Sequence, residues 1–260
     1  MTNFTDAADL LVQIATCRIA KEELETSGKH QQCSKIIHVQ GAASWLDFQV
    51  PEPWSGHLSS APLLFLSSNP SISLTEKYPK GNWSATELGS YFENRFDGYW
   101  VKNGNRALQV SCLEYGDAVG YWSNVRNRAK ELFGRDPVAG QDYVLSEIVH
   151  CKSIGESGVR QAIRCCGGRY LAPMLRIAKT RLIVLVGKKT LEMWNESQDA
   201  KLRPEEKREG TPPIDIEGQT RVLLYMPHPA GGERGPKRFV DRMSETRLAA
   251  LKQFLKSENC

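Results

Sequence analysis

The sequence predicts one α/β domain, a three-layer sandwich around a four-stranded, mostly parallel sheet. Four short apolar runs are near-continuous rather than alternating, as is typical of strands buried on both faces. They span residues 62–67, 143–150, 181–187 and 221–227. Helical patterns separate these runs, and strands that alternate with helices form parallel sheets with helices on both sides.

The predicted helices lie between and after the apolar runs. Apolar residues recur at spacings of three and four over 122–133 and over 239–255, and a further helical region over 159–178 is interrupted at Gly167–Gly168 and at Pro173. We expect residues 1–60 to form a helical or extended N-terminal extension of this single domain. Residues 196–219 are charged and contain Pro and Gly, which predicts an exposed excursion.

Composition excludes some classes of protein. The 260 residues are 40% hydrophobic, and no run approaches the ~18 apolar residues of a membrane span. We expect a cytoplasmic protein, because the residues near the N-terminus include acids and lack the small-residue cleavage site of a secretory signal. We also expect a monomer. A net charge of +4 is compatible with nucleic acid but does not argue for it.

Ligands of such sheets bind beyond the carboxyl ends of the strands, so the segments that follow the apolar runs are the candidate site. All of them are polar and turn-like: residues 67–71, 150–153, 187–189 and 226–232.

These segments carry the motifs of a known family. FLSSNPSIS at 65–73 and HPAGG at 228–232 resemble the two motifs of the uracil-DNA glycosylase superfamily, the first in the Asn-Pro version of mismatch-specific glycosylases. The region between them resembles the iron–sulfur branch: YVLSEIVHCKS at 143–153, CCGGRYLAPML at 165–175 and RLIVLVGKKTLEMW at 181–194. The resemblance runs in order over about residues 62–255, and it implies a glycosylase-like fold and hydrolysis of an N-glycosidic bond.

That reaction passes through an oxocarbenium-like sugar while negative charge collects on the departing base. The resemblance assigns Asn69 to the attacking water, which a carboxamide orients but does not deprotonate, and His228 to the leaving base. No cofactor is required for this catalysis. The alternatives are an Asx-turn at Asn69 and a histidine in a proline-bracketed turn at His228.

Glu147 departs from the family pattern. Counting back from Cys151, it occupies the position of an asparagine that pairs with the edge of uracil in the iron–sulfur branch. A carboxylate repels O4 of uracil and accepts from N4 of cytosine. Because removal of ordinary cytosine would destroy the host genome, this favours a modified cytosine, for example a hydroxymethylated or glucosylated one. In a register shifted by one residue, Glu147 instead points away from the base.

Further residues complete the implied contacts with the base and with DNA. For the base these are Ser68 and a stacking aromatic, Trp83 or Phe96, for which core packing is the alternative. The loop after His228 has no bulky wedge, so Arg234 is expected to fill the gap left by the flipped base. The expected DNA-binding residues are Ser71, Lys152, Lys188, Gly231, Gly232, Arg234, Lys237 and Arg238.

The cysteines leave open whether the protein binds an iron–sulfur cluster. The iron–sulfur branch holds a [4Fe–4S] cluster on four cysteines, and Cys151 and Cys166 match the later pair. Cys17 matches the first ligand, but Ala20 stands where its CxxC partner is expected, so Cys33 is the substitute. The alternative is buried, apolar, reduced cysteines.

The function expected from these residues is a monofunctional DNA glycosylase that removes a modified pyrimidine, leaves an abasic site and acts in phage defence. Three alternatives stay open: a uracil-DNA glycosylase of base-excision repair, a nucleoside or nucleotide N-hydrolase, and a catalytically silent DNA-binding module.

Overall fold

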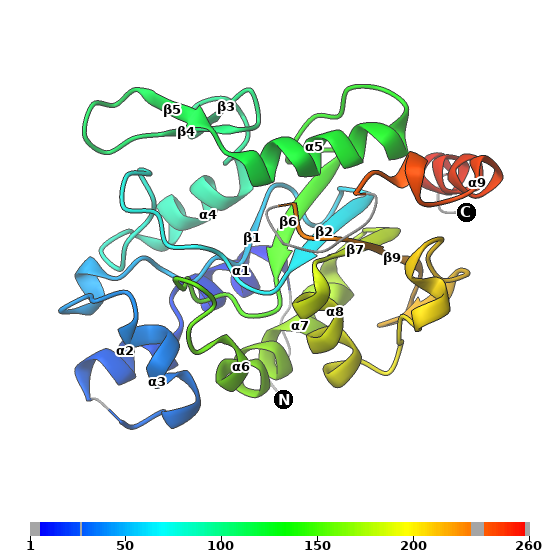
Figure 1. The fold of residues 1–260 in the computed structure, drawn as a ribbon. Helices are drawn as coiled ribbons and strands as arrows, with labels where there is room; N and C mark the ends of the chain where they lie inside the picture. The colour runs from blue at the N-terminus through cyan, green and yellow to red at the C-terminus, as the bar shows by residue number, and fades with distance from the viewer. Residues whose placement is uncertain (1–5, 27, 230–236, 258–260) are drawn as a thin grey trace.

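The computed structural model describes residues 6–26, 28–229 and 237–257. A mixed six-stranded sheet runs through the centre of the molecule in the order β1-β6-β2-β7-β9-β8 (Figure 1). Its strands are β1 (Trp54–Ser55), β2 (Leu63–Ser67), β6 (Tyr143–Glu147), β7 (Leu182–Val186), β8 (Ile214–Ile216) and β9 (Gln219–Met226).

The four apolar runs form the parallel centre of this sheet. β6, β2, β7 and β9 are neighbours and pair in parallel, which confirms that each predicted run is a strand. The expected number of strands was wrong, because β1 and β8 add an antiparallel edge on either side. These edges have two and three residues, too few to produce a recognisable periodicity.

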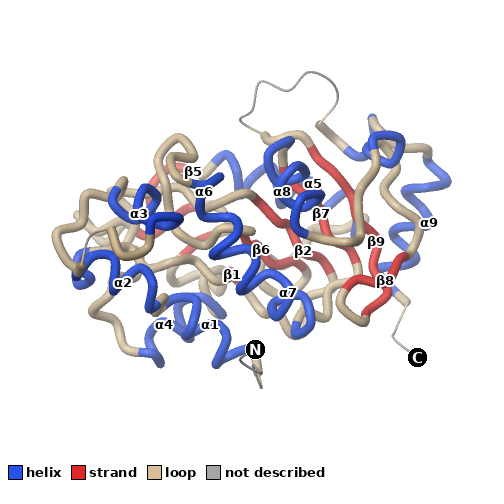
Figure 2. Tube along the Cα trace, turned by 90° about the horizontal axis from the view of Figure 1, so that it is seen from below, coloured by secondary structure: helices blue, strands red, loops and turns tan. Residues whose placement is uncertain are grey.

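Helices cover both faces of the sheet (Figures 1 and 2). Along β2, Leu64 and Leu66 face one hydrophobic core, and Leu63 and Phe65 face the other. The first core lies against α1, α7 and α8, and the second against α5 and α9. The helices are α1 (Ala7–Ala15), α2 (Arg18–Glu25), α3 (Gln31–His38), α4 (Ala85–Glu93), α5 (Gly120–Phe133), α6 (Val159–Ala162), α7 (Gly168–Ile177), α8 (Lys188–Ser197) and α9 (Glu245–Lys256).

A small antiparallel sheet, β3-β4-β5, lies beside α4 and α5 at the edge of the molecule (Figure 1). Its strands are β3 (Val101–Lys102), β4 (Arg106–Leu108) and β5 (Tyr115–Ala118). The sequence does not predict this sheet, because its strands have only two to four residues, too few to show a periodicity.

The predicted 196–219 excursion is more closely packed than expected. It contains a 3-10 turn at Pro204–Lys207 and then β8. Leu202, Thr211 and Ile216 are buried. The segment therefore closes one edge of the sheet, although its charged residues do face solvent.

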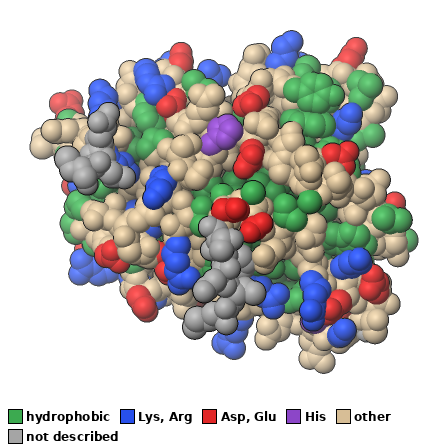
Figure 3. All heavy atoms as spheres, turned by 180° about the vertical axis from the view of Figure 1, so that it is seen from behind, with side chains coloured by type: hydrophobic (Ala, Val, Ile, Leu, Met, Phe, Trp, Pro, Cys, Tyr) green, Lys and Arg blue, Asp and Glu red, His purple; other side chains and the backbone are tan. Residues whose placement is uncertain are grey.

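In the part of the chain that the structure describes, no helix combines the length and the apolar surface needed to cross a bilayer. On the face opposite to that of Figure 1, acidic and basic side chains are interspersed (Figure 3). The described residues on this face do not form a continuous basic stripe of the kind that binds a nucleic-acid backbone.

Candidate active site at the strand ends

One pocket opens beyond the carboxyl ends of the central strands. It has a volume of about 730 Å³, within the ~300–1,000 Å³ typical of small-molecule sites. Of the predicted catalytic and base-binding residues, it brings together Ser68, Asn69, Glu147 and His228. Three strand ends supply them, because β2, β6 and β9 are parallel and end at the same edge of the sheet.

The segments that follow β2 and β6 stay paired beyond the strands. The Ile148 and Val149 amides donate to the Ser67 and Ser68 carbonyls at 2.9 Å, and the Ser153 amide donates to the Pro70 carbonyl at 3.0 Å. This pairing holds the Asn-Pro motif against the segment that carries Glu147.

The carboxamide of Asn69 is oriented by the residue that follows it. Its Nδ2 donates to the Pro70 carbonyl at 2.9 Å, which fixes the carboxamide without forming the Asx-turn expected as an alternative, because in that turn Oδ1 accepts from a backbone N–H two residues on. The hydroxyl of Ser68 donates its single proton to Glu156 at 2.9 Å, and the Asn69 Oδ1 is 3.5 Å from that hydroxyl. This arrangement therefore leaves Oδ1 as an acceptor at the pocket, which is what orienting a water requires.

His228 follows β9 and stacks on Tyr121 of α5. The ring centroids are 5.8 Å apart and the interplanar angle is 22°. The hydroxyl of Tyr121 shares a hydrogen bond of 2.5 Å with Ser67. Gly187 makes room for His228, because a Cβ at this glycine would stand 3.1 Å from the His228 Cβ and its φ is +87°. The imidazole is thus stacked on an aromatic ring, and the absence of a side chain at Gly187 leaves room for His228.

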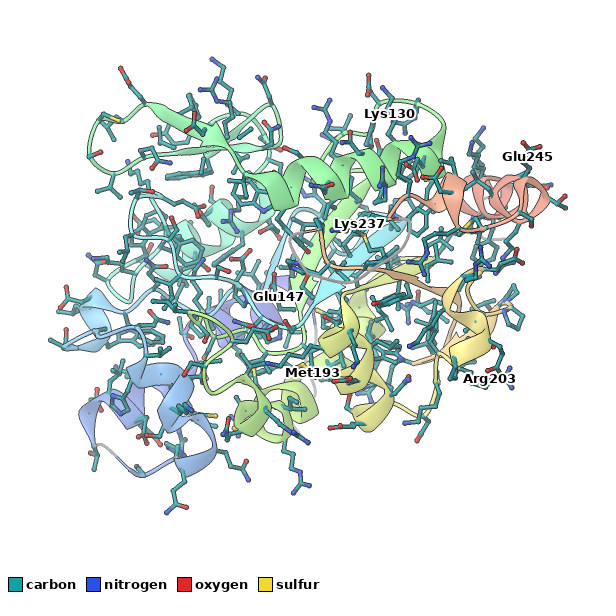
Figure 4. All side chains as sticks on the ribbon, in the orientation of Figure 1. Lys130, Glu147, Met193, Arg203, Lys237 and Glu245 are labelled. Carbon is teal, nitrogen blue, oxygen red and sulfur yellow. The ribbon has the colours of Figure 1, made fainter. Side chains whose placement is uncertain are left out.

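Glu147 lies near the centre of the molecule, at the end of β6 (Figure 4). Its side chain is buried and lines the pocket. Its Oε2 has no hydrogen-bond partner among the described residues. Burial, followed by the charge of Glu52, raises the pKa of Glu147 well above its usual range, which favours the protonated form of the side chain.

The protonated form of Glu147 differs from the carboxylate assumed in the expectation drawn from the sequence. A neutral carboxylic acid has an O–H donor and a carbonyl acceptor, whereas a carboxylate has acceptors only. Glu147 therefore does not repel O4 of uracil. It can donate to N3 and accept from N4 of cytosine, or donate to O4 and accept from N3 of uracil.

A buried charged network forms one wall of the pocket. Arg95 Nη1 is 2.5 Å from Glu52 and Nη2 is 2.6 Å from Glu76, while the Lys152 ammonium is 3.5 Å from Glu52. Two carboxylates and two cations balance within this network. No sequence signal points to Glu52 or Arg95, which the fold brings together from separate segments.

The aromatic residues of the pocket are not those predicted. Phe96 is 8% exposed and packs in the core edge-on to Trp122, and Trp83 packs against Tyr91 and Trp100. Neither Phe96 nor Trp83 lines the pocket, whereas Tyr121 and Trp122 do. The periodicity predicts a helix from residue 122, but it carries no sign that the first turn of this helix faces the site.

The predicted DNA-binding residues lie in different environments. Ser71 lines the pocket, whereas Lys152 is 2% exposed and belongs to the buried network, so it does not lie on a surface that meets phosphates. Lys188 and Arg238 are exposed beside Glu192 and Asp241, and Lys237 donates to the Pro229 carbonyl. Gly231, Gly232 and Arg234 lie outside the described residues.

The four predicted cluster ligands line a second, apolar cavity together with a cysteine that the sequence does not predict there. Cys165 joins them from a π-helical turn at Ile163–Gly167, which presents two consecutive cysteines. π-turns are often found at functional sites. The five cysteines at this cavity are Cys17, Cys33, Cys151, Cys165 and Cys166.

Two of the cavity sulfurs accept backbone hydrogen bonds, a feature that tunes iron–sulfur ligands. The His150 amide donates to Cys166 at 3.3 Å, and the Ala20 and Ile19 amides donate to Cys17. Burial raises the pKa of Cys151, and the Cys33 thiol lowers that of Cys165 to about 6 by donating to it. Within the described ranges, no three His, Cys, Asp or Glu side chains are placed to hold a metal ion. That criterion describes a site for a single ion. The thiols that hold an iron–sulfur cluster surround several irons, so they stand farther apart than the ligands of one ion.

A scan against protein-family models and a search of curated proteins found no match to this chain.

Proposed function

We propose that this chain is a monofunctional DNA glycosylase that hydrolyses the N-glycosidic bond of a flipped-out, modified cytosine and leaves an abasic site. The convergence of Asn69, Glu147 and His228 from three strand ends on one pocket carries the proposal. A base enters such a pocket only after leaving the helical stack.

Each of the three residues has a distinct task. Asn69 Oδ1 accepts from the attacking water and orients it below C1′. The imidazole of His228 stabilises the negative charge that develops on the departing base, as preorganised donors do in other enzymes. Glu147 pairs with the edge of the base, while Tyr121 and Trp122 offer the aromatic surfaces that the flipped ring requires.

The polar lining of the pocket favours a base with a polar 5-substituent. Besides the residues assigned above, the lining includes Thr75, Gln109 and Asp117. These side chains supply hydroxyl, amide and carboxylate groups that suit a hydroxymethyl or sugar substituent.

Excision of uracil is the second candidate function. The neutral Glu147 favours it as well, because its O–H can donate to O4 and its carbonyl can accept from N3–H. The two candidates share their water and leaving-group residues and differ in the base that fills the pocket.

The test is base release from four duplexes of one sequence. They carry cytosine, uracil, 5-hydroxymethylcytosine or glucosylated 5-hydroxymethylcytosine at one position. We expect mass spectrometry to find a released modified cytosine and alkali to cleave the strand at the abasic site. Release of uracil alone would support the second candidate. A gel shift without release would indicate a silent binding module, and free ribose from nucleosides an N-hydrolase; either result would overturn the proposal.

We further propose that the enzyme acts as a cytoplasmic monomer in defence against phages with modified DNA. All six cysteines in the described ranges are free thiols, as is usual in a reducing compartment.

The cysteine cavity supports a [4Fe–4S] cluster as a structural part of this proposal. Cys17, Cys33, Cys151 and Cys166 would be its ligands, with Cys165 as a neighbour. A cluster would cross-link α2, α3, the segment after β6 and the π-turn. Catalysis does not require it, because the pocket residues are separate from these thiols.

Anaerobically purified protein is therefore expected to be brown and to contain iron and sulfide. Cys151→Ser should lose both and lower the melting temperature. The matched control is Cys112→Ser, since Cys112 is exposed and does not line the cavity. Colourless, iron-free and stable wild-type protein would show that the cavity holds only reduced thiols.

A further inference from the structure

A cytosine-type base poses a leaving-group problem that Asn69 and His228 do not solve completely. When the C1′–N1 bond breaks, the electron pair of the bond passes to the base. Uracil delocalises the charge over two carbonyls, whereas cytosine has one. Proton donation to the ring removes the charge, and N3 of cytosine is an open acceptor for that proton.

Glu147 is the side chain in position to reach N3. It ends β6, in register with Ser67 of β2. It is 6% exposed and lines the pocket, and its buried Oε2 has no hydrogen-bond partner in the described chain. A buried polar atom without a partner costs stability, and a bound ligand would satisfy it.

The surroundings of Glu147 keep a proton on it. The charged and titratable groups that face it come from several elements: Glu52 before β1, Arg95 after α4, Lys152 after β6 and Tyr121 on α5. The two cations already balance Glu52 and Glu76 within the buried network. Neither cation of this network is left to neutralise a third carboxylate, so ionised Glu147 would be unpaired and desolvated.

We propose that Glu147 is the general acid of the reaction, a role that rests on the proposed function. Its carbonyl oxygen accepts from N4–H of the flipped base, and its O–H donates to N3. As the C1′–N1 bond breaks, the proton passes to N3 and the base leaves neutral. Water adds to C1′ and releases a proton to solvent, and the Glu147 carboxylate regains a proton when the base departs.

Glu147→Gln is the sharpest test. Glutamine keeps a carbonyl acceptor and has N–H donors in a similar shape, but it has no acidic proton to transfer. We expect single-turnover release of 5-hydroxymethylcytosine, or of its glucosylated form, to fall by about 10²–10⁴-fold. The Kd for a duplex with the same base on a 2′-fluorinated, hydrolysis-resistant sugar should change less than about tenfold, because the hydrogen bonds remain.

The pH profile separates acid catalysis from positioning. In the wild type, release of the cytosine-type base should fall as the pH rises through the raised pKa of Glu147. In Glu147→Gln this fall in rate at high pH should vanish. In Glu147→Asp, which retains an acidic proton, it should persist. Uracil release should differ little between wild type and Glu147→Gln, since uracil carries its own N3 proton.

The outcomes separate this inference from the function on which it rests. If wild type releases a cytosine-type base and Glu147→Gln matches its rate, or loses binding and rate equally, Glu147 is not the acid. If wild type releases no cytosine-type base from any duplex, the proposed function fails and this role fails with it.

Discussion

Replacing Asn69 or His228 with alanine is expected to lower the rate of base release by about 10²–10³-fold each, the loss seen when one preorganised transition-state contact is removed. Asn69→Ala removes the oxygen that orients the water. His228→Ala removes the imidazole that is proposed to stabilise the negative charge on the departing base. Both residues line the pocket and neither is fully buried, so the fold should survive.

The measurement is single-turnover release with saturating enzyme, alongside thermal unfolding of each variant. His57→Ala is the matched control, because His57 is also half-buried but does not line the pocket. Near-wild-type rates in both site variants would mean that the pocket is not where the reaction occurs.

Arg95→Met is expected to cost about 3–5 kcal/mol in the free energy of unfolding, as removal of one partner from a buried ion pair does. Arg95 is 2% exposed and contacts both Glu52 and Glu76. It also lies over the rings of Tyr91 and Trp122, at 5.4 and 5.1 Å from their centroids. Methionine would leave two buried carboxylates with Lys152 as the remaining cation of the network.

Urea unfolding at pH 7 measures this cost, and Arg203→Met provides the control. Arg203 also pairs with two glutamates, but its side chain is 64% exposed, so its loss should change the free energy of unfolding far less than the loss of Arg95. A similar small cost at both positions would show that the buried network contributes no more than a surface pair.

The sequence alone determined the centre of the sheet and the location of the pocket. Each of the runs that form β2, β6, β7 and β9 is apolar on both faces, and such a run has few alternatives to a buried strand. The carboxyl ends of parallel strands lie at the same edge of the sheet. Because Asn69, Glu147 and His228 stand at or just after such ends, their positions along the chain are enough to predict that they lie in one site. The resemblance to the iron–sulfur branch likewise grouped Cys17, Cys33, Cys151 and Cys166.

The tertiary structure decided the electrostatic surroundings of Glu147 and the aromatic residues of the pocket. The pKa of Glu147 depends on burial and on Glu52, a residue from a distant segment with no pattern of its own. Tyr121 rather than Trp83 or Phe96 faces the pocket because α5 turns its first residues toward Ser67 and His228. Periodicity depends on neighbours along the chain, whereas electrostatic interaction and stacking depend on neighbours in space, and only the packed fold brings those together.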